Sequence, residues 1–194
     1  MSNKTFALSS ISTGTKSSSV WDKSAYLIDY QQISTVNLTA GSQSTIEFNN
    51  IPQVFTHLQI RAYAKNTSAG NVDCRIRFNG DTTNSWYSVL QSYGNNSSFT
   101  SGIDANSNRG TFIYIPGSNL SAWGIGIIDI TDYTSTSKTK HIKTIQGFEG
   151  DTTTGFCLFR QSLGKTQKPI TSIQIYPDTD SFAQYSHVAL YGVK

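Results

Sequence analysis

The sequence has little charge and no long apolar run, and both shortages narrow the class of protein. Charged residues make up 14% of the 194 residues, the net charge is +3, and Lys and Arg form no stripe with interleaved aromatic residues. We therefore expect no nucleic-acid partner. No apolar run approaches the roughly 20 residues that cross a membrane, and the first residues lack the apolar core of a signal peptide. We expect no association with a membrane.

Cysteine is scarce as well. Cys74 and Cys157 both fall inside segments that we expect to be strands. A disulfide between them would require Cα atoms within about 7 Å of each other. The favoured interpretation is that both are free, buried and act as small hydrophobic residues, which suits assembly in a reducing cytoplasm. The sequence leaves the disulfide open as the alternative.

Metal-binding patterns are missing. The three histidines, His57, His141 and His187, each stand in an expected strand without a second ligand two or four residues away. Structural and catalytic metal sites usually show such spacing in at least one segment. We therefore predict no metal site and no cofactor.

Catalytic motifs are missing too. The sequence contains no nucleophile elbow, no zinc-protease helix motif and no phosphate-binding glycine loop. The pairs Asp129 with Asp132 and Glu149 with Asp151 could supply the two carboxylates of a glycosidase. Carboxylates in turns more often accept hydrogen bonds from nearby backbone N–H groups. We therefore predict that the protein is not an enzyme.

Uncharged polar residues and aromatic residues are abundant instead. Ser, Thr, Asn and Gln form about two-fifths of the chain, and 12% of the residues are aromatic. From residue 57 onward apolar and polar residues alternate, which is typical of a strand with one buried face. The expected inward residues are Leu58, Ile60, Ala62 and Ala64, and the outward ones are His57, Gln59, Arg61, Tyr63 and Lys65.

Strand-like segments continue to the end of the sequence, separated by turn-forming Asn, Gly, Asp and Pro residues. Their spacing, with no amphipathic helix, predicts an all-β fold: an antiparallel β-sandwich, jelly-roll-like, over residues 26–194. The longest expected loop covers residues 94–109. The expected strands are Tyr26–Leu38, Ser44–Phe48, Leu58–Lys65, Asp73–Asn79, Trp86–Leu90, Gly110–Ile115, Gly124–Ile130, Lys140–Phe148, Gly155–Gln161, Ser172–Tyr176 and His187–Tyr191.

The inward positions of these strands predict the core. Apolar residues at alternate positions should face the opposing sheet. The expected core residues are Leu58, Ile60, Ile76, Phe78, Ile127, Leu158, Ile173, Ile175, Val188 and Leu190.

Residues 1–25 differ from the rest of the chain, because Ser and Thr dominate them and apolar residues are isolated. Such a segment buries too little apolar area to fold alone. One interpretation is a leader without a partner. The favoured one is an extended N-terminal arm that orders by adding to a neighbouring subunit. The expected contact residues of this arm are Phe6, Leu8, Ile11, Val20 and Trp21.

Five blocks occur in a fixed order, at Phe48–Arg61 (FNNIPQVFTHLQIR), Phe78–Asp81 (FNGD), Ile127–Tyr133 (IIDITDY), Ile170–Pro177 (ITSIQIYP) and Leu190–Val193 (LYGV). In this arrangement the chain resembles a group of small virion proteins of tailed bacteriophages, over roughly residues 36–194. The resemblance implies a structural protein of the virion surface, assembled in the cytoplasm of the host bacterium. It does not distinguish capsid from tail.

Two functions follow as expectations. The first is a capsid decoration or cement protein, held by the arm, which contacts its own subunits in a homotrimer and the major capsid protein or other virion proteins. The alternative is a tail-associated adhesin that binds a glycan of the host surface through exposed aromatic rings. The candidate glycan contacts are Trp86, Tyr87, Tyr93 and Trp123. A third possibility, a cell-wall or capsule depolymerase, has no catalytic residues to support it.

Overall fold

Two antiparallel sheets form the protein in the computed structural model, which describes residues 30–83, 86–94, 98–102, 110–149 and 155–194. The larger sheet has eight strands in the spatial order β1 (Tyr30–Asn37), β12 (His187–Val193), β3 (His57–Ala64), β8 (Gly124–Thr131), β9 (Lys140–Glu149), β10 (Gly155–Gly164), β5 (Trp86–Gly94) and β6 (Phe99–Gly102). The smaller sheet has the order β2 (Ile46–Phe48), β11 (Ile173–Pro177), β4 (Val72–Phe78) and β7 (Gly110–Ile115). The predicted all-β sandwich is confirmed.

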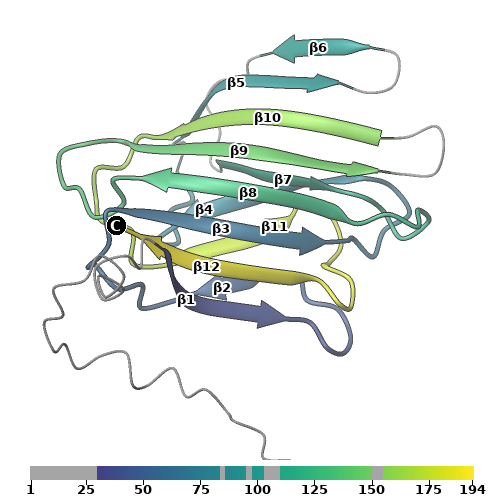
Figure 1. Cartoon of the computed structure of the whole chain (residues 1–194), viewed down its shortest axis with the longest axis horizontal. Helices are drawn as coiled ribbons and strands as arrows, with labels where there is room; N and C mark the ends of the chain where they lie inside the picture. The colour runs from purple at the N-terminus through teal and green to yellow at the C-terminus, as the bar shows by residue number, and fades with distance from the viewer. Residues whose placement is uncertain (1–29, 84–85, 95–97, 103–109, 150–154) are drawn as a thin grey trace, which may run out of the picture.

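The smaller sheet covers only part of the larger one. Figure 1 looks onto the eight-stranded sheet, with β2, β11, β4 and β7 behind it. The edge strand β7 lies behind β8 and β9, so β5 and β6 extend beyond it (Figure 1). One face of the large sheet therefore builds the core, and its other face is left for solvent or for a partner.

The core follows from the period-two alternation of the strands. Ile60 on β3 and Ile128 on β8 belong to the same cluster of buried residues as Ile76 on β4 and Ile175 on β11, and all four are fully buried. Nine of the ten expected core residues are buried: Leu58, Ile60, Ile76, Phe78, Leu158, Ile173, Ile175, Val188 and Leu190.

Ile127 is the exception, and its predicted burial is wrong, because 47% of the residue is exposed. The adjacent Ile128 takes the inward position, and consecutive side chains of a strand point to opposite faces. Ile127 and Ile128 are equally apolar, and only one of them can point inward. A shift of the strand by one residue would exchange which of the two is buried.

The strand boundaries differ from the predicted ones in few places. The connection through Asn50 and Pro52 crosses from the small sheet (β2) to the large one (β3). Strands β5 and β10 extend to Gly94 and Gly164, past the predicted ends. Part of the expected loop 94–109 is a strand, β6, which pairs with β5 from Gln91 opposite Gly102 to Gly94 opposite Phe99.

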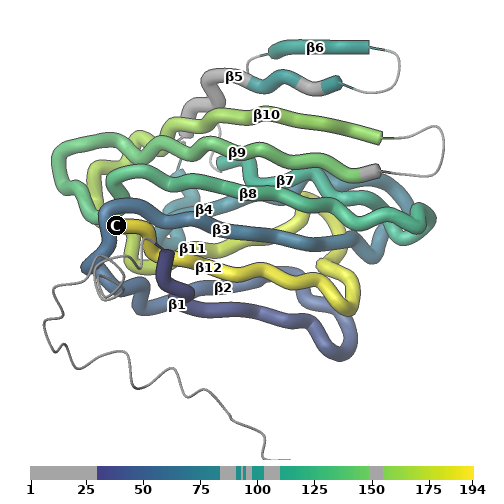
Figure 2. The backbone as a smooth tube through the Cα atoms, viewed as in Figure 1, coloured from purple at the N-terminus to yellow at the C-terminus, as the bar shows by residue number. Residues whose placement is uncertain are grey.

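The first and last strands lie side by side at one edge of the large sheet. Figure 2 shows the purple β1 next to the yellow β12, and their register runs from Tyr30 opposite Val193 to Asn37 opposite His187. Residues 26–29 of the expected first strand lie outside the described residues, as does the whole arm 1–25 with its contact residues Phe6, Leu8, Ile11, Val20 and Trp21.

Candidate functional site

The open face of the large sheet carries three exposed isoleucines, which we call the isoleucine patch: Ile125 and Ile127 on β8 and Ile145 on β9. Their exposed fractions are 57%, 47% and 58%. Ile127 and Ile145 are cross-strand partners, and Phe159 of β10 continues the row beside Ile145. Contiguous exposed apolar side chains on a soluble protein usually mark a contact surface, whereas single ones do not.

Charged and aromatic side chains border the patch. The Arg61 guanidinium lies 5.0 Å from the ring centre of Tyr191 and 5.7 Å from that of Tyr30. On the other side, Lys143 Nζ lies 5.8 Å from the ring centre of Phe159. These cation–π contacts hold the long side chains along the sheet surface. The border therefore carries fixed cations around an apolar centre.

A carboxylate completes the border. Asp129 on β8 accepts a hydrogen bond of 2.8 Å from Gln59 Nε2 on β3. Gln59 Oε1 in turn accepts a hydrogen bond of 2.9 Å from Arg61 Nε. The surface thus combines charges of both signs with an apolar centre, which is the composition of a protein contact surface.

Of the expected glycan contacts, Trp123 is placed in detail. Its ring stacks on Tyr63 with centres 4.8 Å apart and planes 10° from parallel, and Tyr63 is 41% exposed. Trp86, Tyr87 and Tyr93 belong to β5, and their side chains lie outside the described part of the structure. Strands β9 and β10 separate β5 from β8, so Trp123 does not share a strand pair with the other three.

The two cysteines are free and lie in different environments. Cys74 is fully buried on β4, and its burial raises the pKa of the thiol well above the usual value, with the Asp73 carboxylate adding to the effect. The predicted burial of Cys157 is wrong, because this residue is exposed on β10. Its register partner is Gly147, in the row of Ile125 on the open face.

The three histidines stay apart. His57 Nδ1 accepts a hydrogen bond of 3.1 Å from the amide of Asp132, and His141 and His187 lie on β9 and β12. Within the described residues, no group of three His, Cys, Asp or Glu side chains is arranged to hold a metal ion.

The acidic candidates have local partners. Asp132 binds Lys138 Nζ at 3.0 Å, and this hydrogen bond lowers the pKa of the carboxyl. Asp132 also has a φ of 49°, which marks a tight turn directly after β8. Asp129 belongs to the border of the isoleucine patch. The side chain of Glu149, and Asp151, lie outside the described residues.

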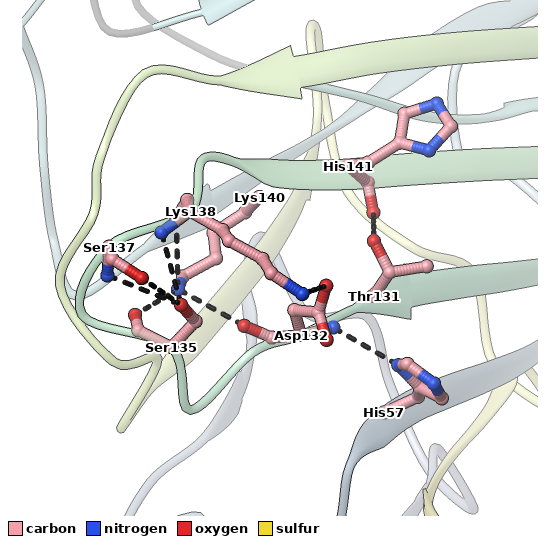
Figure 3. Close-up of polar contacts among 8 residues, drawn as sticks. All are labelled: His57, Thr131, Asp132, Ser135, Ser137, Lys138, Lys140 and His141. Atoms are coloured by element: carbon pink, nitrogen blue, oxygen red, sulfur yellow. Dashed lines mark hydrogen bonds and ion pairs between the residues drawn. The ribbon is translucent and has the colours of Figure 1, made fainter.

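A buried lysine organises the turn between β8 and β9 (Figure 3). Lys140 is fully buried, and its Nζ donates to the carbonyls of Asp132 at 3.1 Å, Lys138 at 3.4 Å and Ser135. Burial lowers the pKa of this ammonium, while the Asp132 carboxylate opposes the shift. All three N–H donors of the ammonium have carbonyl partners, so the lysine stabilises the turn and has no hydrogen left for a substrate.

Comparisons with models of protein families, with curated proteins and with solved structures find no match for this chain. Among the described residues, no helix is long and apolar enough to cross a membrane.

The open face of the large sheet is the candidate site with the strongest support from geometry. In the sequence, the run Ile125-Gly-Ile-Ile128 indicates this face, because isoleucine occupies positions that point to both sides of one strand.

Proposed function

We propose that the chain is a structural virion protein of a tailed bacteriophage, most simply a decoration protein of the capsid surface. The single observation that carries a binding role is the isoleucine patch on the open face of the large sheet. The ordered sequence blocks support the assignment to a virion. The low charge and the abundance of hydroxyl and amide side chains suit a subunit that packs among neighbours.

The occupant of the patch, in this proposal, is a neighbouring copy of the chain. The border offers cations at Arg61 and Lys143 and an anion at Asp129, and a second copy provides both signs on a surface of the same low charge. A strongly charged partner would match only one sign. Among the described residues the large sheet ends in the edge strands β1 and β6, and oligomers commonly cover such edges. We expect a homotrimer.

A pair of variants tests the role of the patch. Replacing Ile127 and Ile145 with Lys adds two charges to the centre of the open face, while the core stays unchanged. We expect the doubly substituted protein to sediment as a monomer at micromolar concentration, whereas the parent protein sediments as an oligomer. The matched control is Val54→Lys, because Val54 is 73% exposed and lies away from the patch in the β2–β3 connection. A monomeric parent protein would contradict the proposal.

The arm provides a second test. Deleting residues 1–25 should leave the sandwich folded, because the buried cluster of the described residues is formed between Leu38 and Leu190, and should abolish stable attachment to purified particles. Each apolar anchor contributes roughly 1.5–3 kcal/mol if fully buried against another subunit. Normal occupancy of the truncated protein on particles would refute the arm hypothesis. Imaging of labelled protein on shell or tail decides between capsid and tail.

The stacked pair of Tyr63 and Trp123 favours a second candidate, the tail-associated adhesin. The two stacked rings cover one another, so the outer face of the pair is the flat platform on which the apolar side of a sugar would lie. Replacing Trp123 with Leu should then abolish binding of the protein to host cells. Unchanged binding to cells would remove the platform from consideration.

A further inference from the structure

The outward residues of the large sheet form rows across its strands, and the rows are centred on β8 and β9. These two strands lie next to each other in the middle of the sheet, with β3 beside β8 and β10 beside β9 (Figure 1). Cross-strand partners on one face lie about 5 Å apart, so each row is a set of neighbours. On the open face, the register partners of β8 and β9 are Ile125 with Gly147, Ile127 with Ile145, and Asp129 with Lys143.

A second copy of the chain could lie on this face in aligned packing, in which the strands of two sheets run within about 30° of each other. A two-fold axis brings a surface against itself, so that a first residue contacts a second one and the reverse contact also forms. If the axis runs along the strands between β8 and β9, β8 of each copy faces β9 of the other. The rows then stay in step, and the register partners of one chain are also the residues that face each other across the contact.

One of these pairs consists of opposite charges. Asp129 is half-buried on β8, and Lys143 is exposed on β9. In the two-fold arrangement the carboxylate of each copy faces the ammonium of the other copy, so the contact forms twice. A charge that loses water in the contact therefore meets an opposite charge, which avoids the cost of an unpaired buried charge.

The other two pairs match in polarity and in size. Ile127 of each copy faces Ile145 of the other, and these side chains are 47% and 58% exposed in the single chain. Ile125 faces Gly147, which has no side chain and so leaves room for the isoleucine of the second copy. Removal of this apolar surface from water favours association.

The flanking strands extend the match, because β3 of each copy faces β10 of the other. In the middle row, Arg61 faces Phe159 of the second copy, which suits a cation over an aromatic ring. In the next row, Tyr63 faces Cys157, and both residues are exposed in the single chain. Neither row brings two like charges together.

Two other two-fold arrangements bring unfavourable pairs together. An axis that runs along β8 itself would place Asp129 against Asp129 of the second copy, and like charges in a contact repel. An axis that crosses the strands at Ile127 reverses the order of the rows and places Asp129 against Ile125. The carboxylate would then lose water without meeting a cation. The pattern of charges therefore selects the axis between β8 and β9.

From these observations we propose that the open face joins two copies of the chain about a two-fold axis that runs along the strands between β8 and β9. This pairing rests on the proposed function, in which a neighbouring copy covers the isoleucine patch, and it specifies how the two copies are arranged. The contact by itself gives a dimer. A homotrimer would be held by other surfaces, such as the sheet edges, and would meet a second trimer through this face.

Mixing two full-length variants tests the pairing. Asp129→Lys places a lysine opposite Lys143 of the second copy, and Lys143→Glu places a glutamate opposite Asp129. Because like charges then face each other, we expect each variant alone to self-associate at least about tenfold more weakly than the parent in sedimentation experiments. In an equimolar mixture each variant meets the opposite charges of the other, so mixed pairs should form about as tightly as parent pairs. Native mass spectrometry identifies the mixed pairs by mass.

The mixture separates contacts between chains from contacts within one chain. Each variant keeps like charges on its own register partners, and mixing leaves these unchanged, so a restored association reports a contact between chains. Glu47→Lys is the matched control, because it makes the same change of charge as Asp129→Lys but lies on β2 of the small sheet. This control should associate as the parent does.

The Cys157 thiol provides a measurement on the parent protein. Cys157 is exposed in the single chain, whereas Cys74 is buried, so a thiol reagent should modify Cys157 alone in the folded protein. In the proposed pair Cys157 lies opposite Tyr63 of the second copy. We expect its reaction to be at least about tenfold slower in the associated protein than after dilution to single chains.

The pairing is overturned if the mixture associates no better than the separate variants, or if Asp129→Lys associates as the parent does. Equal reaction rates of Cys157 in associated and diluted parent protein also overturn it, and this result decides even if a variant misfolds. A parent protein that associates but fails these tests refutes the two-fold arrangement and leaves a neighbouring copy as the occupant of the patch. A monomeric parent protein contradicts both.

Discussion

Strand β8 carries isoleucine on both of its faces, and the two faces lie in opposite environments. Ile128 and Ile130 are fully buried between the sheets, whereas Ile125 and Ile127 are 57% and 47% exposed. Side-chain chemistry is the same on both sides, so what differs is the presence of a second layer. The four-stranded sheet covers one face and leaves the other open. An apolar residue in a strand therefore indicates a buried position only where a second layer of the fold covers that face of the sheet.

The largest expected effect comes from the covered face. Replacing Ile128 with Ala removes buried methyl and methylene groups and leaves a cavity, at a cost of about 2–5 kcal/mol. Chemical denaturation should show a lower midpoint with an unchanged slope. A loss below about 1 kcal/mol would mean that the two sheets are not packed at this position.

A smaller effect is expected two residues earlier on the same face, at Gly126. A Cβ atom added there would lie 2.4 Å from Ile113 Cγ2 of β7, so the opposing side chain would have to move. Replacing Gly126 with Ala should therefore destabilise the fold by about 1–3 kcal/mol through overpacking. The additional substitution Ile113→Ala removes the Cγ2 atom of the clash, so the two substitutions together should cost less than the sum of their separate effects in thermal melts. Additive losses would argue against that contact as the cause.

On the open face the expected change in stability is small. Replacing Ile127 with Thr keeps a β-branched residue in the strand and should change the free energy of unfolding by less than about 1 kcal/mol. The same substitution should weaken self-association, measured by sedimentation. Destabilisation equal to that of Ile128→Ala would erase the difference between the faces.

The smallest effect is expected just after β8, at Asp132. The hydrogen bond from Lys138 lowers the pKa of this carboxyl in the folded protein. The associated stability is therefore present above the unfolded pKa, near 4, and is lost as the pH falls through the lower folded value. Replacing Lys138 with Met should return the pKa of Asp132 towards its usual value in an NMR titration. An unchanged pKa would assign the shift to other groups.

The alternation of residues along the strands was enough to predict the all-β sandwich and nine of ten core positions. The residue at position 127 was misplaced because Ile127 and Ile128 are equally apolar, and only the packed structure selects between them. Strand β6 was missed because Phe99-Thr-Ser-Gly102 has few apolar residues, is mostly exposed and, among the described strands, pairs with β5 alone.

The candidate sites were harder to predict than the fold. The isoleucine patch depends on cross-strand neighbours from β8, β9 and β10. The ion pair of Asp73 with Arg160 joins residues 87 positions apart in two different sheets. Lys140 resembles an exposed charge in the sequence, and its burial depends on the path of the turn before it. Pairings of this range are properties of the tertiary arrangement and have no local pattern.

The pairing of β12 between β1 and β3 has a consequence for the order of folding. The strand that comes last in this sequence fills an interior position of the large sheet, so β1 and β3 cannot be joined until it has been made. During synthesis, the edge of β3 and the apolar residues of its inward face therefore remain uncovered. Pairing of β12 with β1 and β3 joins segments that are far apart in the sequence. The chain loses loop entropy before these contacts form, and this loss slows folding. The sheet should close only after β12 has been synthesised, and until then the unpaired edge of β3 is the point at which a nascent chain would aggregate.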